Sequence, residues 1–208
     1  MNVPDLAGIG SGFSDLSSGS QAVFRAALQA MSHPGRLVEL VHDAQVPAAG
    51  HRASAGILLA LMDADSRVWL SPALAESGPW LRFHTGCTVV DEPAAAHLAW
   101  VSGPAEMPPL ASFAQGSDDY PDQSTTCILD VPGLDDCGQW ILRGPGIPDE
   151  TRLRTGGLPA PLGARFAAWF AAEWAANHAR FPRGVDVFLA APGLIAALPR
   201  TTHLELES

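Results

Sequence analysis

The chain has 208 residues, of which 47% are hydrophobic, and its formal net charge is −10. This composition favours a globular protein over a disordered one, because there is enough apolar surface to offset the conformational entropy lost on folding. The acidic excess disfavours nucleic acid and anionic lipid as partners. The apolar run "AGILLALM" is too short to cross a bilayer, and the first residues lack the basic and apolar parts of an export signal. We therefore expect a cytoplasmic protein without a membrane partner.

All 12 basic residues are arginine, so the chain has no lysine. The absence of lysine excludes an aldimine with pyridoxal phosphate, a phosphate-loop lysine and a lysine general base. Arginine can still bind carboxylate or phosphate through its planar guanidinium. Cys87, Cys127 and Cys137 are widely spaced and form no C-x-x-C motif. This spacing favours buried thiols over disulfides or a zinc site.

The first 19 residues are rich in Gly and Ser, and we expect them to form a mobile arm before a single domain over residues 20–208. We expect Ser20 to cap a helix in which Val23, Phe24, Leu28 and Met31 make one apolar face. Pro34 and Gly35 end this helix. The next elements expected are a strand at 36–41, a buried helix at 54–62 and a strand at 67–70.

The middle of the chain predicts short elements separated by turns. In order, these are a short helix at 72–81, strands at 88–90 and 97–102, a short helix at 108–116 and an acidic loop at 117–123. We expect strand 125–131 to form a hairpin with 138–144 across the turn "PGLDDC", and residues 143–157 to hold a Gly-Pro-Gly turn and an edge strand.

Residues 161–181 give the strongest helical pattern, with aromatic residues along one stripe (Phe166, Trp169, Phe170 and Trp174). Such a stripe usually belongs to the core, although it can also form a subunit interface. Buried strands are expected at 184–191 and 194–199 around a Pro-Gly turn. Because helices and strands alternate, the predicted class is α/β, with a mixed sheet flanked by helices.

Two short motifs contain candidate anion ligands. In "LRFHT", Arg82 and His84 lie on the same side if the segment is extended, where together they could hold an anion. We favour the alternative, an ion pair at the end of a helix or strand. In "LRGPGI", backbone N–H groups beside Arg143 suit a phosphate, but a hairpin corner also explains the glycines.

The segment "PRTTH" near the C-terminus combines a guanidinium, two hydroxyl groups and an imidazole in Arg200, Thr201, Thr202 and His203. This set suits a phosphoryl or phosphonyl oxygen. It also suits a docking contact with another subunit, which we favour because a terminal segment needs anchoring to stay ordered.

The remaining polar clusters do not indicate a reaction centre. His33, His42 and His51 are spaced by nine residues, which matches neither a helix face nor a strand face, so we expect no metal site. The paired carboxylates at 118–119 and 135–136 lie in turn-like stretches and are expected to be solvated. No complete set of nucleophile, base and oxyanion hole is visible, and we assign no catalytic residue.

Several separate stretches together resemble one known family, the H subunits of the bacterial carbon–phosphorus lyase core complex (PhnH). They occur in the same order over about residues 20–206, which makes the resemblance more specific than any one motif. The stretches are "FRAALQAMSHPG", the buried segment through "VWLS", "LRFHT", "LRGPGI", "FPRGVDV" and "LPRTTHLE".

The resemblance implies a role in phosphonate breakdown. It implies that the chain belongs to a core complex with G, I and J subunits, which joins a phosphonate to the ribose of ATP with loss of adenine. This transferase chemistry would need the complex, and the chain would have no activity alone. The resemblance also implies a reduced pyridoxal-phosphate-dependent transferase fold that has lost its cofactor, and a homodimer.

Two other classes of function stay open at this point. One is a stand-alone enzyme or binding protein for a phosphorylated small molecule, which would use Arg82, His84, Arg143 and Arg200. The other is an interaction module that docks partners through the aromatic helix.

Overall fold

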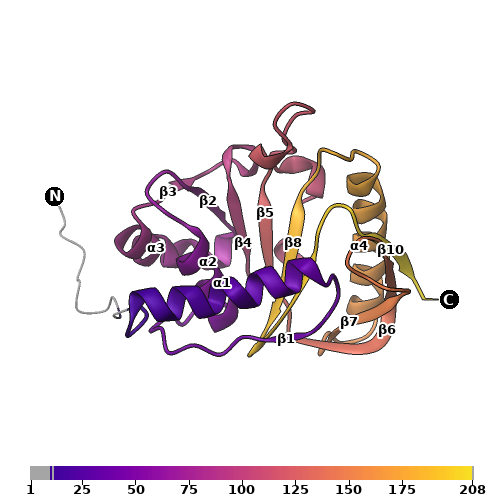
Figure 1. Ribbon diagram of the computed structural model, residues 1–208, viewed down its shortest axis with the longest axis horizontal. Helices are drawn as coiled ribbons and strands as arrows, with labels where there is room; N and C mark the ends of the chain where they lie inside the picture. The colour runs from indigo at the N-terminus through magenta and orange to yellow at the C-terminus, as the bar shows by residue number, and fades with distance from the viewer. Residues whose placement is uncertain (1–9, 11, 208) are drawn as a thin grey trace.

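The computed structural model describes residues 10 and 12–207, which form an α/β fold with a seven-stranded sheet and a three-stranded sheet (Figure 1). No helix in this part of the chain is long and apolar enough to cross a membrane. The strands are β1 (Val38–Glu39), β2 (Arg67–Leu70), β3 (Thr88–Val90), β4 (Leu98–Val101), β5 (Thr126–Asp130), β6 (Gly133–Arg143), β7 (Thr151–Gly156), β8 (Asp186–Ala191), β9 (Leu194–Leu198) and β10 (His203–Leu206). The α-helices are α1 (Leu16–Ser32), α2 (Arg52–Leu61), α3 (Gly78–Thr85) and α4 (Leu162–His178).

The large sheet is mixed, as predicted, and its strand order is β1-β9-β8-β5-β4-β2-β3. The strands β3, β2, β4, β5 and β8 are parallel to one another. Strand β9 returns antiparallel to β8, so the expected pair of strands around the Pro-Gly turn is confirmed. The amino ends of β5 and β8 therefore lie at one edge of the sheet, and the carboxyl ends of β2, β4 and β5 lie at the opposite edge.

The predicted hairpin between 125–131 and 138–144 is wrong. Strand β5 pairs in parallel with β4 and β8, whereas β6 joins the small antiparallel sheet in the order β10-β6-β7. The burial pattern gives the physical reason. Residues 127–130 of β5 are all buried, as in a central parallel strand, while the two faces of β6 differ in exposure. The turn between them carries the chain from one sheet to the other.

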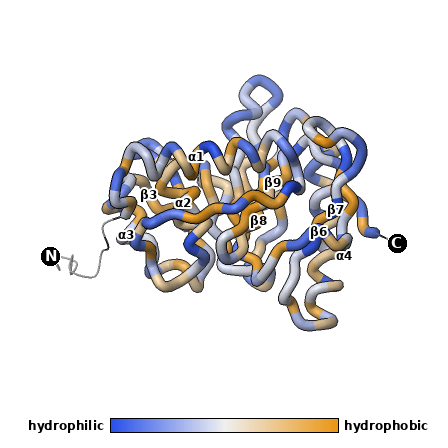
Figure 2. Tube along the Cα trace, turned by 60° about the horizontal axis from the view of Figure 1, so that its bottom comes forward, coloured by the Kyte–Doolittle hydropathy of each residue, from blue (hydrophilic) through white to orange (hydrophobic). Residues whose placement is uncertain are grey.

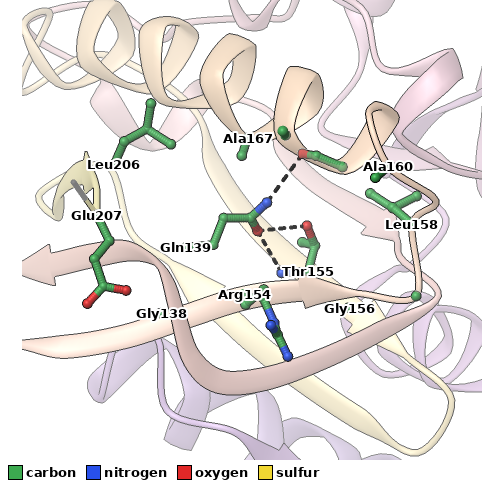
Figure 3. Close-up of a pocket in the computed structure, with 13 residues that line it drawn as sticks. Gly138, Gln139, Arg154, Thr155, Gly156, Leu158, Ala160, Ala167, Leu206 and Glu207 are labelled. Atoms are coloured by element: carbon green, nitrogen blue, oxygen red, sulfur yellow. Dashed lines mark hydrogen bonds between the residues drawn. The ribbon is translucent and has the colours of Figure 1, made fainter.

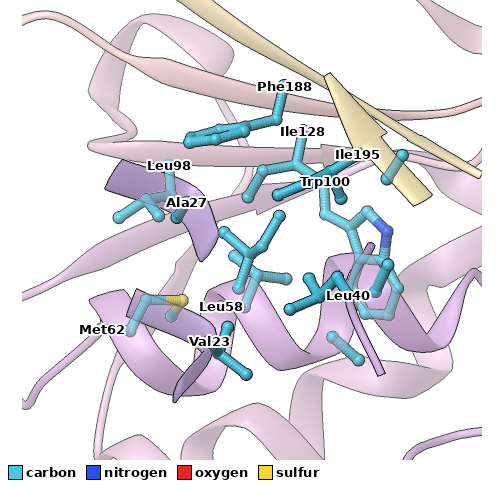
Figure 4. Packing of buried hydrophobic residues seen from close by; sticks show 14 of the residues in the cluster. Val23, Ala27, Leu40, Leu58, Met62, Leu98, Trp100, Ile128, Phe188 and Ile195 are labelled. Carbon is cyan, nitrogen blue, oxygen red and sulfur yellow. The ribbon is translucent and has the colours of Figure 1, made fainter. Parts of the chain in front are cut away.

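Helices α1, α2 and α3 pack on one face of the large sheet. Figure 4 shows this core, in which Val23, Leu58 and Met62 from the helical side meet Ile128 and Phe188 from the strands. Alternate strand residues point to the other face, where Leu129 and Leu189 pack with α4 and the small sheet. The chain thus has one apolar core on each side of the large sheet, because successive strand residues face opposite ways.

Helix α1 begins earlier than predicted. Its N-cap is Asp15, whose side chain accepts a hydrogen bond from the backbone N–H of Ser18 at 3.0 Å, so Ser20 lies inside the helix. Phe13 is buried beside His42, with the ring centroids 5.6 Å apart. Residues 1–9 and 11 lie outside the described residues, so the mobile arm at 1–19 stays a prediction; its last residues pack on the domain.

The apolar face predicted for α1 is confirmed for Val23, which is buried, and for Met31, which packs against the core, but it is wrong for Phe24 and Leu28. The residues that face the core are Val23, Ala27 and Ala30, while Phe24 is 48% exposed and Leu28 is 58% exposed. The helix is apolar on more than one side, and the small alanine side chains allow it to approach the sheet closely. The large apolar side chains therefore remain on the surface.

Two predicted segments differ in conformation. The motif "LRFHT" belongs to α3, because the helix continues from Gly78 to Thr85 and ends at Gly86 in a left-handed conformation. The helix expected at 108–116 is only a 3₁₀ turn at Leu110–Ser112. The backbone is extended at Pro109 before this turn and at Phe113 after it, so the helical segment is limited to these three residues.

The aromatic stripe of α4 is part of the core, as predicted. Phe166, Phe170 and Trp174 are buried against the small sheet, and the rings of Phe170 and Trp174 stack with centroids 5.9 Å apart. Buried Trp140 of β6 packs on Phe170 and donates its indole N–H to the carbonyl oxygen of Ala167 at 3.2 Å. These contacts attach the small sheet to α4.

Candidate functional site

Arg200 lies at the amino ends of β5 and β8, where it forms a half-buried ion pair with Asp186. Its Nε and Nη2 atoms donate to the Asp186 carboxylate, and Nη2 also donates to Ser124 Oγ at 2.6 Å. Its Nη1 donates to the carbonyl oxygens of Pro121 at 2.8 Å and Pro182 at 3.4 Å. A guanidinium has five N–H groups, and these contacts engage all of them. In this arrangement no donor is left for an external anion.

The next three residues anchor the C-terminal segment on α4. The carbonyl oxygen of Thr202 accepts the indole N–H of Trp174 at 2.8 Å, whereas the buried Thr202 hydroxyl has no hydrogen-bond partner. Thr201 is half-buried. The exposed His203 ring lies against His178, with centroids 3.9 Å apart. His178 Nδ1 lies 2.9 Å from the Arg200 carbonyl oxygen, and it must carry a proton because a carbonyl only accepts.

Arg143 lies directly opposite His203 in the pairing of β6 with β10. Its guanidinium is on the outer face of the small sheet, where it pairs with Glu150 at 2.8 Å and Glu205 at 3.1 Å. Arg152, which is next to them on the same face, forms ion pairs with Glu150 and Glu207. The Gly-Pro-Gly turn after Arg143 closes on itself, since the N–H of Ile147 donates to the carbonyl oxygen of Gly144.

Arg82 and His84 lie on α3, at the other end of the large sheet from β6 and β10 (Figure 1). Because the segment is helical, residues two positions apart do not share a face, and the paired anion site is not formed. Arg82 is exposed. His84 Nε2 contacts the Gly10 carbonyl oxygen at 2.8 Å, and its ring packs edge-on against Trp80. The structure therefore separates these two residues from the C-terminal candidates.

A polar cluster that no sequence motif indicated lies at the carboxyl edge of the large sheet, the edge where ligands usually bind in such folds. Asp130 ends β5 and is buried. Its carboxylate accepts hydrogen bonds from the Ser54 hydroxyl, the Trp100 indole N–H at 3.2 Å and the His51 backbone N–H at 2.8 Å. Burial raises the pKa of Asp130 above its ordinary value. The sequence feature that could have indicated this cluster is the acidic residue at the end of the apolar strand β5.

The Asp130 cluster holds α2 in place. His51 is the N-cap of α2 and Ser54 lies in its first turn, so the carboxylate serves as a remote cap for this helix. The Ser54 hydroxyl donates directly to Asp130, with no imidazole between them. This arrangement therefore differs from a Ser-His-Asp triad, in which an imidazole lies between the serine and the acid.

Glu106 is a second acid at this edge. Its carboxylate accepts hydrogen bonds from the Ser102 hydroxyl at 2.8 Å and from the backbone N–H of Ala73 at 3.3 Å. Hydrogen bonds from the Ser71 and Ser102 hydroxyls lower the pKa of Glu106. These contacts join the segments after β2 and β4.

Among residues 10 and 12–207, no group of three or more His, Cys, Asp or Glu side chains is arranged to hold a metal ion. A hollow of about 800 Å³ lies between the small sheet and the start of α4 (Figure 3). At its centre, the Gln139 side chain accepts hydrogen bonds from the N–H and hydroxyl of Thr155 and donates to Gly163. Much of its lining is glycine and alanine.

Two further hollows lie on the surface. One, of about 510 Å³, lies where the Pro34-Gly35 turn meets the Gly-Pro-Gly turn, and Arg36 and Arg152 are at its border. The other is a shallow apolar groove of about 200 Å³ beside α1, which we call the α1 groove. It is lined by Phe24, Ala27, Leu28, Met31, Leu61, Thr126 and Phe188.

The family comparison places the chain in a class, the bacterial phosphonate metabolism proteins. The chain belongs to the PhnH family of this class, because residues 11–205 match the family described as "Bacterial phosphonate metabolism protein (PhnH)". A Rhizobium meliloti (strain 1021) protein named "Alpha-D-ribose 1-methylphosphonate 5-triphosphate synthase subunit PhnH" is 39% identical over 197 residues, which cover 94% of each chain. A Stutzerimonas stutzeri protein named "Putative C-P lyase subunit protein HtxG" is 32% identical over 90% of this chain and 86% of its own length.

Proposed function

We propose that the chain is a non-autonomous subunit of the carbon–phosphorus lyase core complex. In this role it supports transfer of an alkylphosphonate to the ribose of ATP, which gives ribose 1-phosphonate 5-triphosphate. The main support is the 39% identity, over 94% of the chain, to a protein named as a subunit of the corresponding methylphosphonate synthase. The second relative is also named as a lyase subunit.

The contacts of the candidate anion ligands support a structural role for this subunit. Arg200 has all its donors engaged within the chain, and Arg143 pairs with two glutamates. His84 contacts the backbone of the N-terminal segment. Since these groups hold the fold together, we place the reacting groups in other subunits, and the chain alone has no transferase activity.

The proposed partners are the G, I and J subunits and a second copy of this chain, all in the cytoplasm. The α1 groove supports the homodimer. Helix α1 contains one charged residue, Arg25, and no acid, so two chains of net charge −10 can meet there with little repulsion. We also infer that the fold is a reduced pyridoxal-phosphate-dependent transferase fold that does not hold the cofactor, since the chain lacks the lysine that forms the aldimine.

The homodimer is tested by charge substitution in the α1 groove. The variant Phe24→Glu/Leu28→Glu should elute as a monomer of 21.8 kDa, while the wild type should have twice this mass by light scattering. Val41→Glu is the control, because Val41 is exposed but does not line the groove. A dimer that persists in the double variant would rule out the groove as its interface.

The proposed function is tested by deleting the gene in the native host and measuring growth on methylphosphonate as the sole phosphorus source. We expect growth to stop and to return when the wild-type gene is supplied on a plasmid. Growth on inorganic phosphate should be unaffected in both strains. Normal growth of the deletion strain on methylphosphonate would contradict the proposal.

A further inference from the structure

Arg200 joins two loops that are far apart in the chain. Loop 115–124 precedes β5, loop 179–185 follows α4, and Arg200 Nη1 donates to a proline carbonyl oxygen in each. The loops also contact each other, because Arg183 pairs with Asp118 at 3.2 Å and the N–H of Gly184 donates to the Gln115 carbonyl oxygen at 2.9 Å. Two loops that would otherwise move separately are therefore held as one unit.

Each loop presents an exposed aromatic side chain immediately before its bound proline. Tyr120 is 59% exposed and Phe181 is 60% exposed. Large aromatic side chains on the surface are the usual anchors of protein interfaces, because they bury much area at a small cost in side-chain entropy. A rigid backbone beneath them reduces the ordering cost of docking further.

The same surface has more acids than cations: the two loops hold three aspartates, while their two arginines are Arg183, which pairs with Asp118, and Arg180, which donates to Gln115 Oε1 at 3.2 Å. Asp119 and Asp122 are exposed on either side of Tyr120, and neither forms an ion pair with the described residues. Loop 115–124 projects beyond the amino ends of the strands in Figure 1 and is drawn as hydrophilic in Figure 2. An aromatic pair with carboxylates at its border is complementary to an apolar patch bordered by arginine or lysine.

We propose that Tyr120, Phe181, Asp119 and Asp122, which we call the clamped-loop surface, dock a basic surface of a different protein subunit. This inference rests on the proposed function, because it requires that the chain works within a complex. A second copy of the chain is a poorer occupant than a basic surface, since a symmetric contact would bring together more carboxylates than guanidinium groups from these loops. Arg200 is a positioning residue in this account: it holds both loops but does not touch the partner.

The test is co-expression of the affinity-tagged full chain with the other subunits of the core complex from the same host, followed by quantification of the recovered subunits. The variant Tyr120→Ala/Phe181→Ala should lower the recovery of its direct partner at least tenfold. The control Phe83→Ala/Val41→Ala removes exposed apolar side chains elsewhere and should leave recovery unchanged. Both variants should keep the wild-type melting temperature, because the substituted side chains are exposed.

The charge component is tested separately with Asp119→Asn/Asp122→Asn. Raising the salt concentration from about 50 mM to about 500 mM should weaken recovery by the wild type, and this salt effect should be smaller for the double variant. The control is Asp65→Asn/Asp91→Asn, which neutralises two other exposed acids and should keep the full salt effect.

The outcomes separate this inference from the proposed function. Suppose that the wild type recovers its partners and the Tyr120/Phe181 variant recovers them equally well. The clamped-loop surface then does not dock the partner, while the proposed function stands. If that variant instead loses its own dimer, the occupant is a second copy and the inference is overturned. If the wild type recovers no other subunit, both proposals fail.

Discussion

Asp186, the first residue of β8, accepts hydrogen bonds from both the backbone N–H and the guanidinium of Arg200. The Arg200 side chain is only 13% exposed. Removing one partner of this half-buried pair leaves the other charge partly desolvated and unpaired. We therefore expect Arg200→Ala to lower the free energy of unfolding by about 2–3 kcal/mol, less than for a fully buried pair.

Arg200→Lys is the matched control for charge. Lysine keeps the positive charge but lacks the planar guanidinium, so it cannot reach Asp186, Ser124 and both prolines together. We expect Arg200→Lys to lower the free energy of unfolding by about 1–2 kcal/mol, less than Arg200→Ala does, because each charge-assisted hydrogen bond contributes about this much. Urea unfolding followed by tryptophan fluorescence measures both variants. If Arg200→Ala had the same free energy of unfolding as the wild type, the contacts of Arg200 would not stabilise the fold.

Asp130 predicts a pH dependence with a defined sign. Its pKa is higher in the folded protein than the ordinary value of 3.8, because the carboxyl group is buried. The folded state therefore binds this proton more tightly than the unfolded state, and protonation stabilises the fold. This contribution is full below pH 3.8 and is lost as the pH rises through the folded pKa.

The Asp130 contribution can be isolated by comparison with Asp130→Asn, which does not titrate at this position. The free energy of unfolding of the wild type minus that of the variant should decrease as the pH rises from 4 towards 8. Urea titrations at several pH values measure this difference. A difference that increases with pH would mean that the hydrogen bonds of Asp130 outweigh its burial.

The glycine turns at Gly35 and Gly146 pack against neighbouring segments too closely for a side chain. A Cβ on Gly146 would lie 2.4 Å from the Ser32 carbonyl oxygen, and the residue has a φ of +85°. Gly146→Ala should therefore lower the free energy of unfolding by about 2 kcal/mol or more, because it adds both backbone strain and a clash.

Two other glycines separate strain from clash. Gly193 has a φ of +76° with open space around it, so Gly193→Ala should lose about 1–2 kcal/mol from strain alone. Gly103 has an extended backbone and open space, and Gly103→Ala should change stability little. Thermal unfolding of the three variants should follow this order. Equal stability of Gly146→Ala and Gly103→Ala would contradict the packing of the two turns.

The three cysteines should differ in reactivity. Cys87 and Cys127 are buried, and burial raises the pKa of both thiols, while Cys137 is exposed on β6. Only the exposed thiol should react readily, because alkylation needs an accessible thiolate. Mass spectrometry after brief iodoacetamide treatment should show one modification in native protein and three in urea. Modification of native Cys137→Ser at a similar rate would contradict this assignment.

The sequence predicted those elements whose signal is local. Helix α4, the pair β8 and β9, and the mixed α/β class follow from periodicity and turn residues within one segment. The partner of β5 could not be inferred in the same way, because the pairing of β5 with β8 joins residues about 60 positions apart. The outward turn of Phe24 and Leu28 likewise depends on what packs against α1, which the helical period does not specify.

The sequence indicated which residues carry suitable polar groups, but not which other residues those groups contact. The composition of "PRTTH" indicated Arg200 as a candidate ligand. Its partners Asp186 and Ser124 come from other segments, and they occupy the guanidinium with contacts inside the chain. The Asp130 cluster was missed because the side chains of Ser54 and Trp100 meet it only after the sheet has formed. A polar group whose role depends on contacts across the fold leaves no local motif in the sequence.

The central claim, that this chain supports phosphonate transfer only within a complex, is tested most directly by reconstitution. Purified chain, ATP and methylphosphonate are followed by phosphorus NMR, with and without the other core subunits. The account predicts no ribose phosphonate from the chain alone, little from the other subunits without it, and restored formation when it is added. Turnover by the isolated chain, or full turnover in its absence, would contradict the account.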